Sequence, residues 1–372
     1  MRITLVIFAL VAGGAERVMA AMANYWAEKG WTVNLLTLDS GKVPPFYPLH
    51  PAVCHRSLAL AGISANPVQA LLSNFQRIRK LRAAIRETRP DAVISLMSET
   101  NVLTLLATAG LGVPVLVQEQ NDPSQQAMRR TWDTLRHWTY PRATHVVLLT
   151  ARSLGYFSPR VQNRARIIPN PAMVSVAPRL PNSGNGDAKT MIAMARFVPQ
   201  KGLHMMLQAF AQVAARHPDW SLEILGDGPL RGELEALTES LGLRARVRLP
   251  GTTQEPHEKL RRADLFVLSS RHEGFPLSLC EAMACGLPAI SFDCPTGPAE
   301  IIRDGIDGVL VPPENVGALS EAMDRLMSDA PRREALAARA PEVLDRYGLE
   351  KIMGLWEATL SEALAPGKKQ RA

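Results

Sequence analysis

Two patterns of apolar and polar positions alternate along the chain. Short apolar, partly β-branched runs predict strands, and the stretches between them carry apolar residues at helical spacing. The strands expected in the first half are 3–10, 33–38, 92–96, 113–117 and 144–149; those expected in the second half are 190–195, 222–225, 247–249, 265–268, 288–292 and 308–311. Strands that alternate with helices indicate parallel sheets covered by helices. The fold class predicted is therefore α/β, with two such sheets.

The domain boundary is expected near residue 175. Residues 177–186 are rich in Pro, Gly, Asn and Ser and have no periodicity, which is typical of a linker. We predict one domain at 1–175, a second at 176–345, and a last helix with its tail at 346–372. Within that last segment, 349–364 has apolar residues at helical spacing, and 367–372 is expected to fray.

Composition excludes several classes of protein. With 372 residues, 47% of them apolar and 21% charged, the chain is long enough for two cores and is not a largely disordered protein. No apolar stretch approaches the roughly 20 residues of a membrane span. Residues 1–10 have the character of a secretory signal or of a buried first strand, and we favour the strand. The four cysteines (Cys54, Cys280, Cys285, Cys294) lack C-x-x-C spacing, which favours a reducing cytoplasm.

Positive charge is concentrated in the first half of the chain. Residues 1–172 hold 19 Lys and Arg against 9 Asp and Glu, whereas the remainder holds 23 against 26, within a total of +7. Much of the basicity falls in 71–89, a helical pattern. This stretch is either a solvated helix face or an electropositive surface for anionic lipid headgroups or a lipid diphosphate. Nucleic acid is not an expected partner, because only 5% of residues are aromatic and no recognition motif occurs.

The stretch from Glu273 to Glu281 carries the strongest chemical signal. It follows the apolar run 265–268, so Glu273 is expected on a loop at the carboxyl end of a strand. Pro276 suits the first turn of a helix, and Glu281 then lies more than one turn into it. The unpaired N–H groups of that first turn form a site for a phosphate. Carboxylates on both sides of an anion site suit a ligand with hydroxyl groups on both sides of a diphosphate, such as a sugar nucleotide.

Residues 271–276 and 281–288 resemble the signature of the retaining family 4 glycosyltransferases, of the glycosyltransferase group 1 type. Three further segments, 13–17, 195–202 and 226–229, occur in the order that the family requires. The resemblance spans nearly the whole chain, is strongest at 190–315 and is thinnest at 40–90. It implies the GT-B fold, in which two Rossmann-like domains face each other. The first domain would bind the acceptor, the second the nucleotide sugar, and the last helix would cross back onto the first.

The resemblance also implies roles for individual residues. Arg196 and Lys201 would neutralise the donor diphosphate, Glu281 would bind the ribose hydroxyls, and Glu273 would bind a hydroxyl of the donor sugar. Direct attack or general base catalysis by Glu273 is the alternative. The residues expected to act in catalysis are Glu273, Arg196 and Lys201. The residues expected to contact the donor besides these and Glu281 are Gly14, Gly274, Phe275, Pro276, Leu277, Ser278 and the backbone of Leu249.

Acceptor contacts are less clearly indicated. Glu99, Glu119 and Asp122 follow apolar strands of the first domain and are candidates, with ordinary loop capping as the alternative. The sequence has no Asp-x-Asp pair, so we expect no metal, and we expect no cofactor beyond the nucleotide-sugar substrate. The Pro-Thr-Gly-Pro loop at 295–298 looks like that of a subgroup acting on lipid-linked or surface polysaccharides, including lipopolysaccharide.

The function predicted is that of a retaining, metal-independent glycosyltransferase. It would transfer a hexose or N-acetylhexosamine from a UDP-sugar to a lipid-linked glycan or polysaccharide precursor. The expected location is cytoplasmic, peripheral on the inner face of the cell membrane, with an anionic membrane surface as a partner. The alternatives are a nucleotide-sugar epimerase or a soluble sugar-phosphate glycosyltransferase of the same fold, a noncatalytic carbohydrate- or membrane-binding protein, and a glycoside hydrolase.

Overall fold

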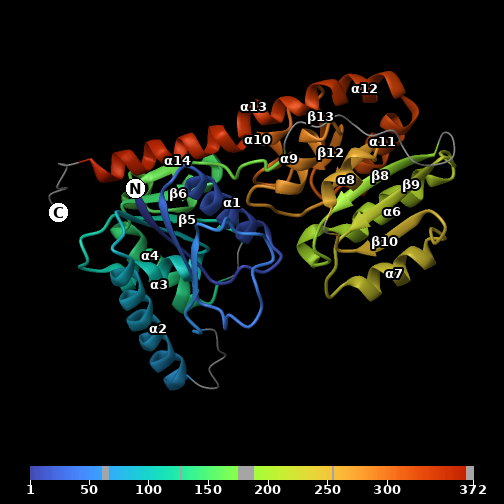
Figure 1. The fold of residues 1–372 in the computed structure, drawn as a ribbon. Helices are drawn as coiled ribbons and strands as arrows, with labels where there is room; N and C mark the ends of the chain where they lie inside the picture. Colours follow the sequence, from blue (N-terminus) through green and yellow to red (C-terminus); the bar gives the residue numbers. More distant parts are fainter. Residues whose placement is uncertain (61–66, 126–127, 175–187, 254, 366–372) are drawn as a thin grey trace. The chain divides into compact units, whose positions relative to one another are not determined.

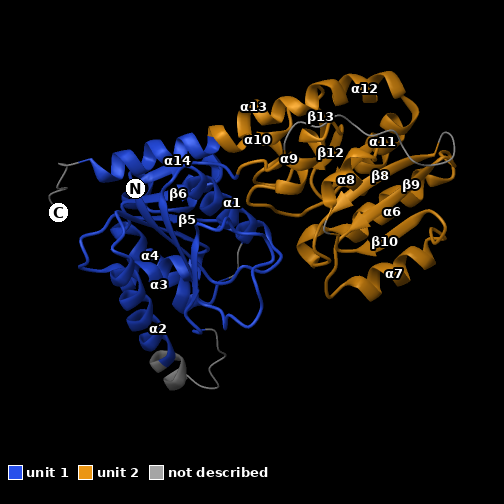
Figure 2. Cartoon of the chain, in the orientation of Figure 1, with its two compact units in different colours: residues 1–170, 352–372 blue, residues 171–351 orange. Residues whose placement is uncertain are grey.

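The computed structural model describes residues 1–60, 67–125, 128–174, 188–253 and 255–365. The predicted linker at 177–186 and the predicted tail at 367–372 lie outside these residues. The chain divides into two compact units, which Figure 2 shows in blue and orange: unit 1 comprises 1–170 with 352–372, and unit 2 comprises 171–351.

Unit 1 contains a parallel sheet with the strand order β3-β2-β1-β4-β5-β6-β7. The strands are β1 Arg2–Ile7, β2 Thr32–Thr37, β3 Cys54–Ser57, β4 Ala92–Leu96, β5 Val115–Gln118, β6 His145–Leu148 and β7 Ala165–Ile167. The helices are α1 Gly14–Glu28, α2 Pro67–Thr88, α3 Ser98–Thr108, α4 Arg130–Thr139, α5 Pro159–Gln162 and α14 Leu349–Leu364, with short 3-10 turns η1 Tyr140–Arg142 and η2 Ala151–Tyr156. Figure 1 shows α14 over one face of the sheet and α2 and α3 over the other.

Unit 2 contains a second parallel sheet with the order β10-β9-β8-β11-β12-β13. Its strands are β8 Lys189–Met194, β9 Trp220–Leu225, β10 Val247–Gly251, β11 Leu265–Leu268, β12 Ala289–Phe292 and β13 Gly308–Val311. The other elements are η3 Pro199–Lys201, α6 Leu203–Ala214, α7 Arg231–Ser240, α8 Pro256–Arg261, α9 Leu277–Ala284, α10 Pro298–Ile301, α11 Val316–Ser328, α12 Ala330–Arg339, η4 Ala340–Glu342 and α13 Val343–Tyr347.

Both sheets have the strand order of a Rossmann fold, so the predicted fold class is confirmed. In each sheet the order reverses between the unit's first strand and its fourth, which are β1 and β4 in unit 1 and β8 and β11 in unit 2. Ligands of open parallel sheets bind at the carboxyl ends of the strands beside such a reversal. This rule selects the loops after β1 and β4 in one unit and those after β8 and β11 in the other.

The last helix packs on unit 1, as expected. Trp356 of α14 is fully buried, and Lys29 Nζ of α1 lies 2.9 Å from Glu357 Oε1. The guanidinium of Arg166 forms a further ion pair with Glu362. The chain therefore returns to its first unit after completing the second.

The division into units falls after Asn170, five residues before the boundary that composition indicates, and the return falls at Ile352 instead of residue 346. The backbone explains both positions. The N–H of Ala172 donates to the carbonyl of Tyr347 at 2.7 Å, and Ala172 forms a parallel bridge with Gly348. The segment that leaves unit 1 is thus paired with the segment that returns to it, and both belong to unit 2.

Two edge strands, β3 and β7, are not predicted from the sequence. The strand β3 is Cys-His-Arg-Ser and β7 is Ala-Arg-Ile, and neither has a fully buried residue. Edge strands need no continuous apolar run because one side faces solvent. Among the described residues, no helix combines the length and apolar character that crossing a lipid bilayer demands.

Candidate active site

In unit 2, an ion pair joins the loop after β8 to the loop after β11. Lys201 Nζ donates to Glu273 Oε1 at 2.6 Å, and Ser270 Oγ donates to the same oxygen at 2.6 Å. The Lys201 and Glu273 side chains are 17% and 7% exposed. Both donors use Oε1. The other carboxylate oxygen, Oε2, accepts no hydrogen bond from any residue that the structure describes.

Close backbone packing holds Lys201 in this position. Gly202 follows it with φ +58°, and a Cβ there would lie 2.2 Å from the carbonyl oxygen of Ser269. Only glycine allows this approach and this conformation. The hydroxyl of Ser269 donates to the Lys201 carbonyl at 2.9 Å, which closes the contact.

A third loop, which follows β12, also contacts Glu273. Thr296 Oγ1 donates to the Glu273 carbonyl oxygen. Gly297 has φ +96°, and a Cβ there would lie 2.6 Å from Pro276 Cδ, so this loop and the start of α9 are in direct contact. Burial, followed by the charge of Glu273, raises the pKa of Cys294 to about 12, so this thiol stays neutral.

The amino end of α9 presents free donors. The helix begins at Leu277, one residue after Pro276, which is its N-cap. The N–H groups of Leu279 and Cys280 bond to the Pro276 carbonyl, whereas those of Leu277 and Ser278 have no acceptor among the described residues. They are the orphan donors of a helix start, at its positive end, where an anion is stabilised.

Arg196 follows β8 at the same edge of the sheet. Its side chain is exposed and makes no hydrogen bond or ion pair to any residue that the structure describes. The structure therefore holds one predicted cation, Lys201, in a pair with a predicted carboxylate and leaves the other cation available to a ligand. Of the remaining loop residues, Gly274 is half-buried, and Phe275 is buried with its ring 5.1 Å from that of Tyr347, centroid to centroid.

Glu281 lies on α9, more than one turn after its start, as expected. The residue is 0% exposed, and its Oε2 lies 3.8 Å from His257 Nε2 of α8. Hydroxyl groups of a ligand therefore reach this carboxylate only if surrounding side chains move. Leu249 of β10 is half-buried, and its carbonyl accepts a hydrogen bond from Arg231 Nη1 at 3.0 Å.

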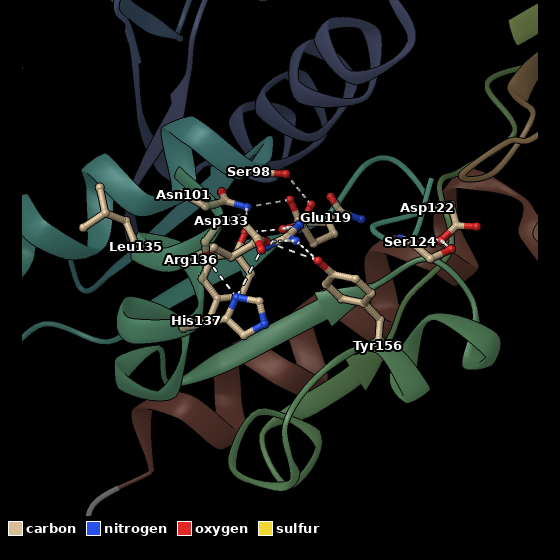
Figure 3. Close-up of polar contacts among 12 residues, drawn as sticks. Ser98, Asn101, Glu119, Asp122, Ser124, Asp133, Leu135, Arg136, His137 and Tyr156 are labelled. Atoms are coloured by element: carbon tan, nitrogen blue, oxygen red, sulfur yellow. Dashed lines mark hydrogen bonds and ion pairs between the residues drawn. The ribbon is translucent and has the colours of Figure 1, made fainter. Parts of the chain in front are cut away.

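In unit 1, Glu119 is the centre of a buried network (Figure 3). Ser98 Oγ donates to its Oε2 at 2.6 Å, and the Tyr140 hydroxyl donates to its Oε1. Arg136 Nη1 lies 3.8 Å from Oε1, and the Arg136 and Glu119 side chains are 1% and 2% exposed. Burial, followed by the charge of Glu119, raises the pKa of Tyr140 well above its usual value, so Tyr140 remains a neutral donor. Both Glu119 oxygens are thus engaged within the fold.

The other candidates of unit 1 lie differently. Asp122 is buried, and its Oδ1 accepts from the backbone N–H and the hydroxyl of Ser124 at 2.9 and 2.7 Å, which is loop capping. Glu99 is exposed on the first turn of α3, after Met97, whose φ is +76°. Gly14 is exposed and begins α1 directly after the first loop.

Both units of the chain match known protein families. Residues 180–343 match the family model described as glycosyl transferases group 1, and residues 13–171 match the glycosyl transferase 4-like domain. The chain is a group 1 glycosyltransferase. The two matches together cover most of both units.

Curated relatives of this glycosyltransferase include bacterial proteins. An exopolysaccharide phosphotransferase of Streptomyces coelicolor is 35% identical over 77% of this chain, but that match covers only 28% of the relative's length. A Campylobacter jejuni enzyme, named as an α-1,4-N-acetyl-D-galactosaminyltransferase acting on a diNAcBac-PP-undecaprenol-linked glycan, is 26% identical over 97% of this chain and 99% of its own length.

Solved structures share the fold of the glycosyltransferase at low identity. HepE of Anabaena in complex with UDP and glucose has a TM-score of 0.79 at 18% identity, covering 97% of this chain and 99% of that one. Sucrose-phosphate synthase of Thermosynechococcus elongatus has a TM-score of 0.83 at 20% identity, with the same coverage. Both confirm the GT-B fold that the sequence motifs indicate.

The sequence analysis of the glycosyltransferase missed the partners of its candidate residues. Ser270 and Thr296 hold Glu273, and Tyr140 and Arg136 hold Glu119. Ser270 stands among polar residues directly after a predicted strand, and this position indicates a residue of the site. Arg136 had no such signal, because it occurs in a basic helix of unremarkable pattern.

Proposed function

We propose that this glycosyltransferase is a retaining enzyme that transfers a hexose or an N-acetylhexosamine from a UDP-sugar to a lipid-linked glycan or polysaccharide precursor. The observation that carries the proposal is the Lys201–Glu273 pair at one edge of the sheet. The guanidinium of Arg196 and the N–H groups of Leu277 and Ser278 lie at the same edge and have no partner among the described residues. These groups have the charges and donors that a sugar diphosphate requires.

The donor diphosphate would bind to the cations and to the start of α9. Charge develops on the departing diphosphate as its bond to the sugar breaks, and fixed cations and N–H donors at that position lower the barrier. Arg196 presents a fork that matches phosphate oxygens. Lys201 would add positive charge near the diphosphate, and its pair with Glu273 fixes the position of its ammonium group.

Glu273 would recognise the donor sugar through its free oxygen. Oε1 already accepts from Lys201 and Ser270, and Oε2 remains available for a sugar hydroxyl. The ion pair also reduces the charge that the carboxylate offers to an electrophilic carbon. This geometry supports recognition over nucleophilic attack, so direct catalysis by Glu273 is the weaker alternative.

Retention then requires no enzymatic nucleophile. The bond between the sugar's anomeric carbon and the diphosphate oxygen breaks, and the acceptor oxygen forms its bond on the same face. The acceptor proton passes to the departing phosphate oxygen, which balances the reaction. Glu281 would bind the ribose hydroxyls after the side chains around it, including His257, rearrange.

The acceptor would bind to unit 1, and the enzyme would act on the inner face of the membrane. The Campylobacter relative is named for an undecaprenol-linked acceptor, and the Streptomyces relative for exopolysaccharide. The basic stretch of α2 would contact anionic lipid. Glu99 is the exposed acceptor candidate of unit 1 and is preferred to Glu119, whose oxygens are engaged, and to the capping Asp122.

One assay tests the proposal. Purified enzyme is incubated with radiolabelled UDP-glucose, UDP-galactose, UDP-GlcNAc and UDP-GalNAc and with polyprenyl-diphosphate glycans as acceptors, with and without EDTA. Transfer of label into the lipid fraction in both conditions, with an α-linked product by NMR, is expected. Loss of transfer with EDTA contradicts metal independence, a β-linked product contradicts retention, and no transfer with any donor contradicts the reaction.

A further inference from the structure

Unit 1 has an open pocket of about 460 Å³ at the end of its sheet where the strands begin. The candidate acceptor residues lie at the other end, where the strands finish. Arg89 lies shortly before β4, and Leu111 and Val113 lie shortly before β5, so the pocket is at the amino ends of these two adjacent strands. Glu99 and Glu119 follow the carboxyl ends of the same strands. The volume is within the range of about 300–1,000 Å³ that is typical of small-molecule sites.

Three arginines line this pocket together with a few apolar residues. Arg82 and Arg86 come from α2, Arg89 follows the helix, and the apolar side chains are Ile85, Leu111 and Val113. Guanidinium groups match phosphate oxygens in geometry as well as in charge. The aliphatic side chains of Leu111 and Val113 in the same lining suit a ligand that carries carbon next to its phosphate.

Arg82 is fixed before any ligand arrives. Its Nη1 donates to the carbonyls of Ala107 and Ala109, at 2.8 and 2.7 Å, at the carboxyl end of α3. Its Nε and Nη2 have no acceptor among the residues that the structure describes. One guanidinium is therefore held rigidly by the fold, which reduces the entropy lost when its remaining donors bind a ligand.

Arg86 and Arg89 are exposed, and their guanidinium groups have no partner within the described parts of the chain. The acidic residues that adjoin them in sequence are engaged elsewhere. Glu87 pairs with Arg56, and Asp91 accepts the backbone N–H of Arg2 at 2.7 Å. The positive charge of the pocket is thus not compensated by these neighbours.

The backbone also favours a specific role for Arg89. It has φ +44°, the left-handed conformation that glycine normally adopts just after a helix. Arginine tolerates this conformation poorly, and strained positions of this kind concentrate at ligand sites.

We propose that this arginine pocket binds a phosphate monoester or phosphodiester that bears a small carbon moiety. The site is separate from the donor diphosphate site of unit 2 and goes beyond the proposed transfer reaction. Two sources share this chemistry: the headgroup of an anionic phospholipid and a free phosphorylated metabolite.

The test uses the full-length enzyme saturated with UDP, so that the proposed donor site is filled. sn-Glycerol 3-phosphate is titrated calorimetrically into the wild type, into R86A/R89A, and into R79A/K80A. The last variant removes the same charge from exposed positions of α2 that do not line the pocket. We expect binding about tenfold weaker or more in R86A/R89A and unchanged in R79A/K80A, because charge-assisted hydrogen bonds are lost only in the first.

Flotation with phosphatidylglycerol vesicles, with phosphatidylcholine vesicles as the reference, then separates the sources. Greater loss of flotation in R86A/R89A than in R79A/K80A identifies the lipid headgroup, and equal loss identifies the free metabolite, provided that glycerol phosphate binds as expected. Absence of glycerol phosphate binding to the wild type, or equal weakening of binding in both variants, overturns the proposal that this pocket binds a phosphate ester. UDP binding is measured separately, so failure of the donor site is distinguished from failure of this one.

Discussion

Lys201 Nζ lies 2.6 Å from Glu273 Oε1, and this contact joins two loops that are 72 residues apart in the sequence. It connects the loop after β8 with the loop after β11, on either side of the point where the strand order of unit 2 reverses. A largely buried charge pair at that position restrains both loops. It also leaves one carboxylate oxygen and one neighbouring arginine for a ligand.

The first prediction concerns the stability that this pair provides. Lys201→Ala leaves the Glu273 carboxylate buried with Ser270 as its one side-chain donor among the residues that the structure describes, and we expect the free energy of unfolding to fall by about 3 kcal/mol. Lys189→Ala is the matched control, because its pair with Asp219 is 33% and 36% exposed. We expect at most about 1 kcal/mol for that change. Urea unfolding followed by circular dichroism measures both, and equal losses would contradict a structural role for the pair.

The second prediction separates recognition from nucleophilic attack by Glu273. Glu273→Gln keeps the shape of the side chain but replaces an ionic acceptor by a neutral amide. We expect transfer to fall about 10- to 100-fold, the equivalent of one charge-assisted hydrogen bond, with the product still α-linked. Intact-protein mass spectrometry of the wild type during turnover should show no glycosylated enzyme. A trapped sugar on Glu273, or loss of all activity in the amide variant, would support attack.

The third prediction assigns Glu119 a structural role. Glu119→Gln removes one of the two carboxylates near the buried guanidinium of Arg136, while Asp133 Oδ1 stays 2.6 Å from Arg136 Nη2. Because charge-assisted hydrogen bonds from Ser98 and Tyr140 are also weakened, we expect a loss of about 2 kcal/mol in the free energy of unfolding. Transfer per folded molecule should stay close to that of the wild type at a temperature where the variant is folded. The exposed Glu99 supplies the control: Glu99→Gln should leave stability unchanged. A selective rise in the KM for acceptor in the Glu119 variant, without destabilisation, would restore Glu119 as an acceptor contact.

The fourth prediction concerns acid stability. Burial, followed by the charge of Arg166, lowers the pKa of His145 from its usual 6.5. Below pH 6.5 the unfolded chain binds a proton that the folded chain resists, so the free energy of unfolding should decrease as the pH falls toward 5. His145→Asn should reduce that decrease. Parallel pH dependence in the wild type and the His145 variant would contradict this assignment.

The sequence predicts the sheets and the loops at their carboxyl ends, because these follow from local patterns. The run 265–268 and the turn residues after it place Glu273 correctly, and 308–311 is a strand as expected. Partners across the fold are not local. Glu119 and Glu273 both follow apolar strands, yet one is enclosed by Tyr140 and Arg136 and the other keeps a free oxygen. Nothing near either glutamate in the sequence distinguishes them, since the difference depends on helices and loops that pack over them.

Donor binding by unit 2 is the central claim, and calorimetric titration of UDP-glucose tests it most directly. We predict that the wild type binds, that Arg196→Ala binds about tenfold more weakly or worse, and that Arg244→Ala binds as the wild type does, since Arg244 is 85% exposed and pairs with Glu239. Failure of the wild type to bind any of UDP-glucose, UDP-galactose, UDP-GlcNAc and UDP-GalNAc, or equal affinity in the Arg196 variant, would contradict the account.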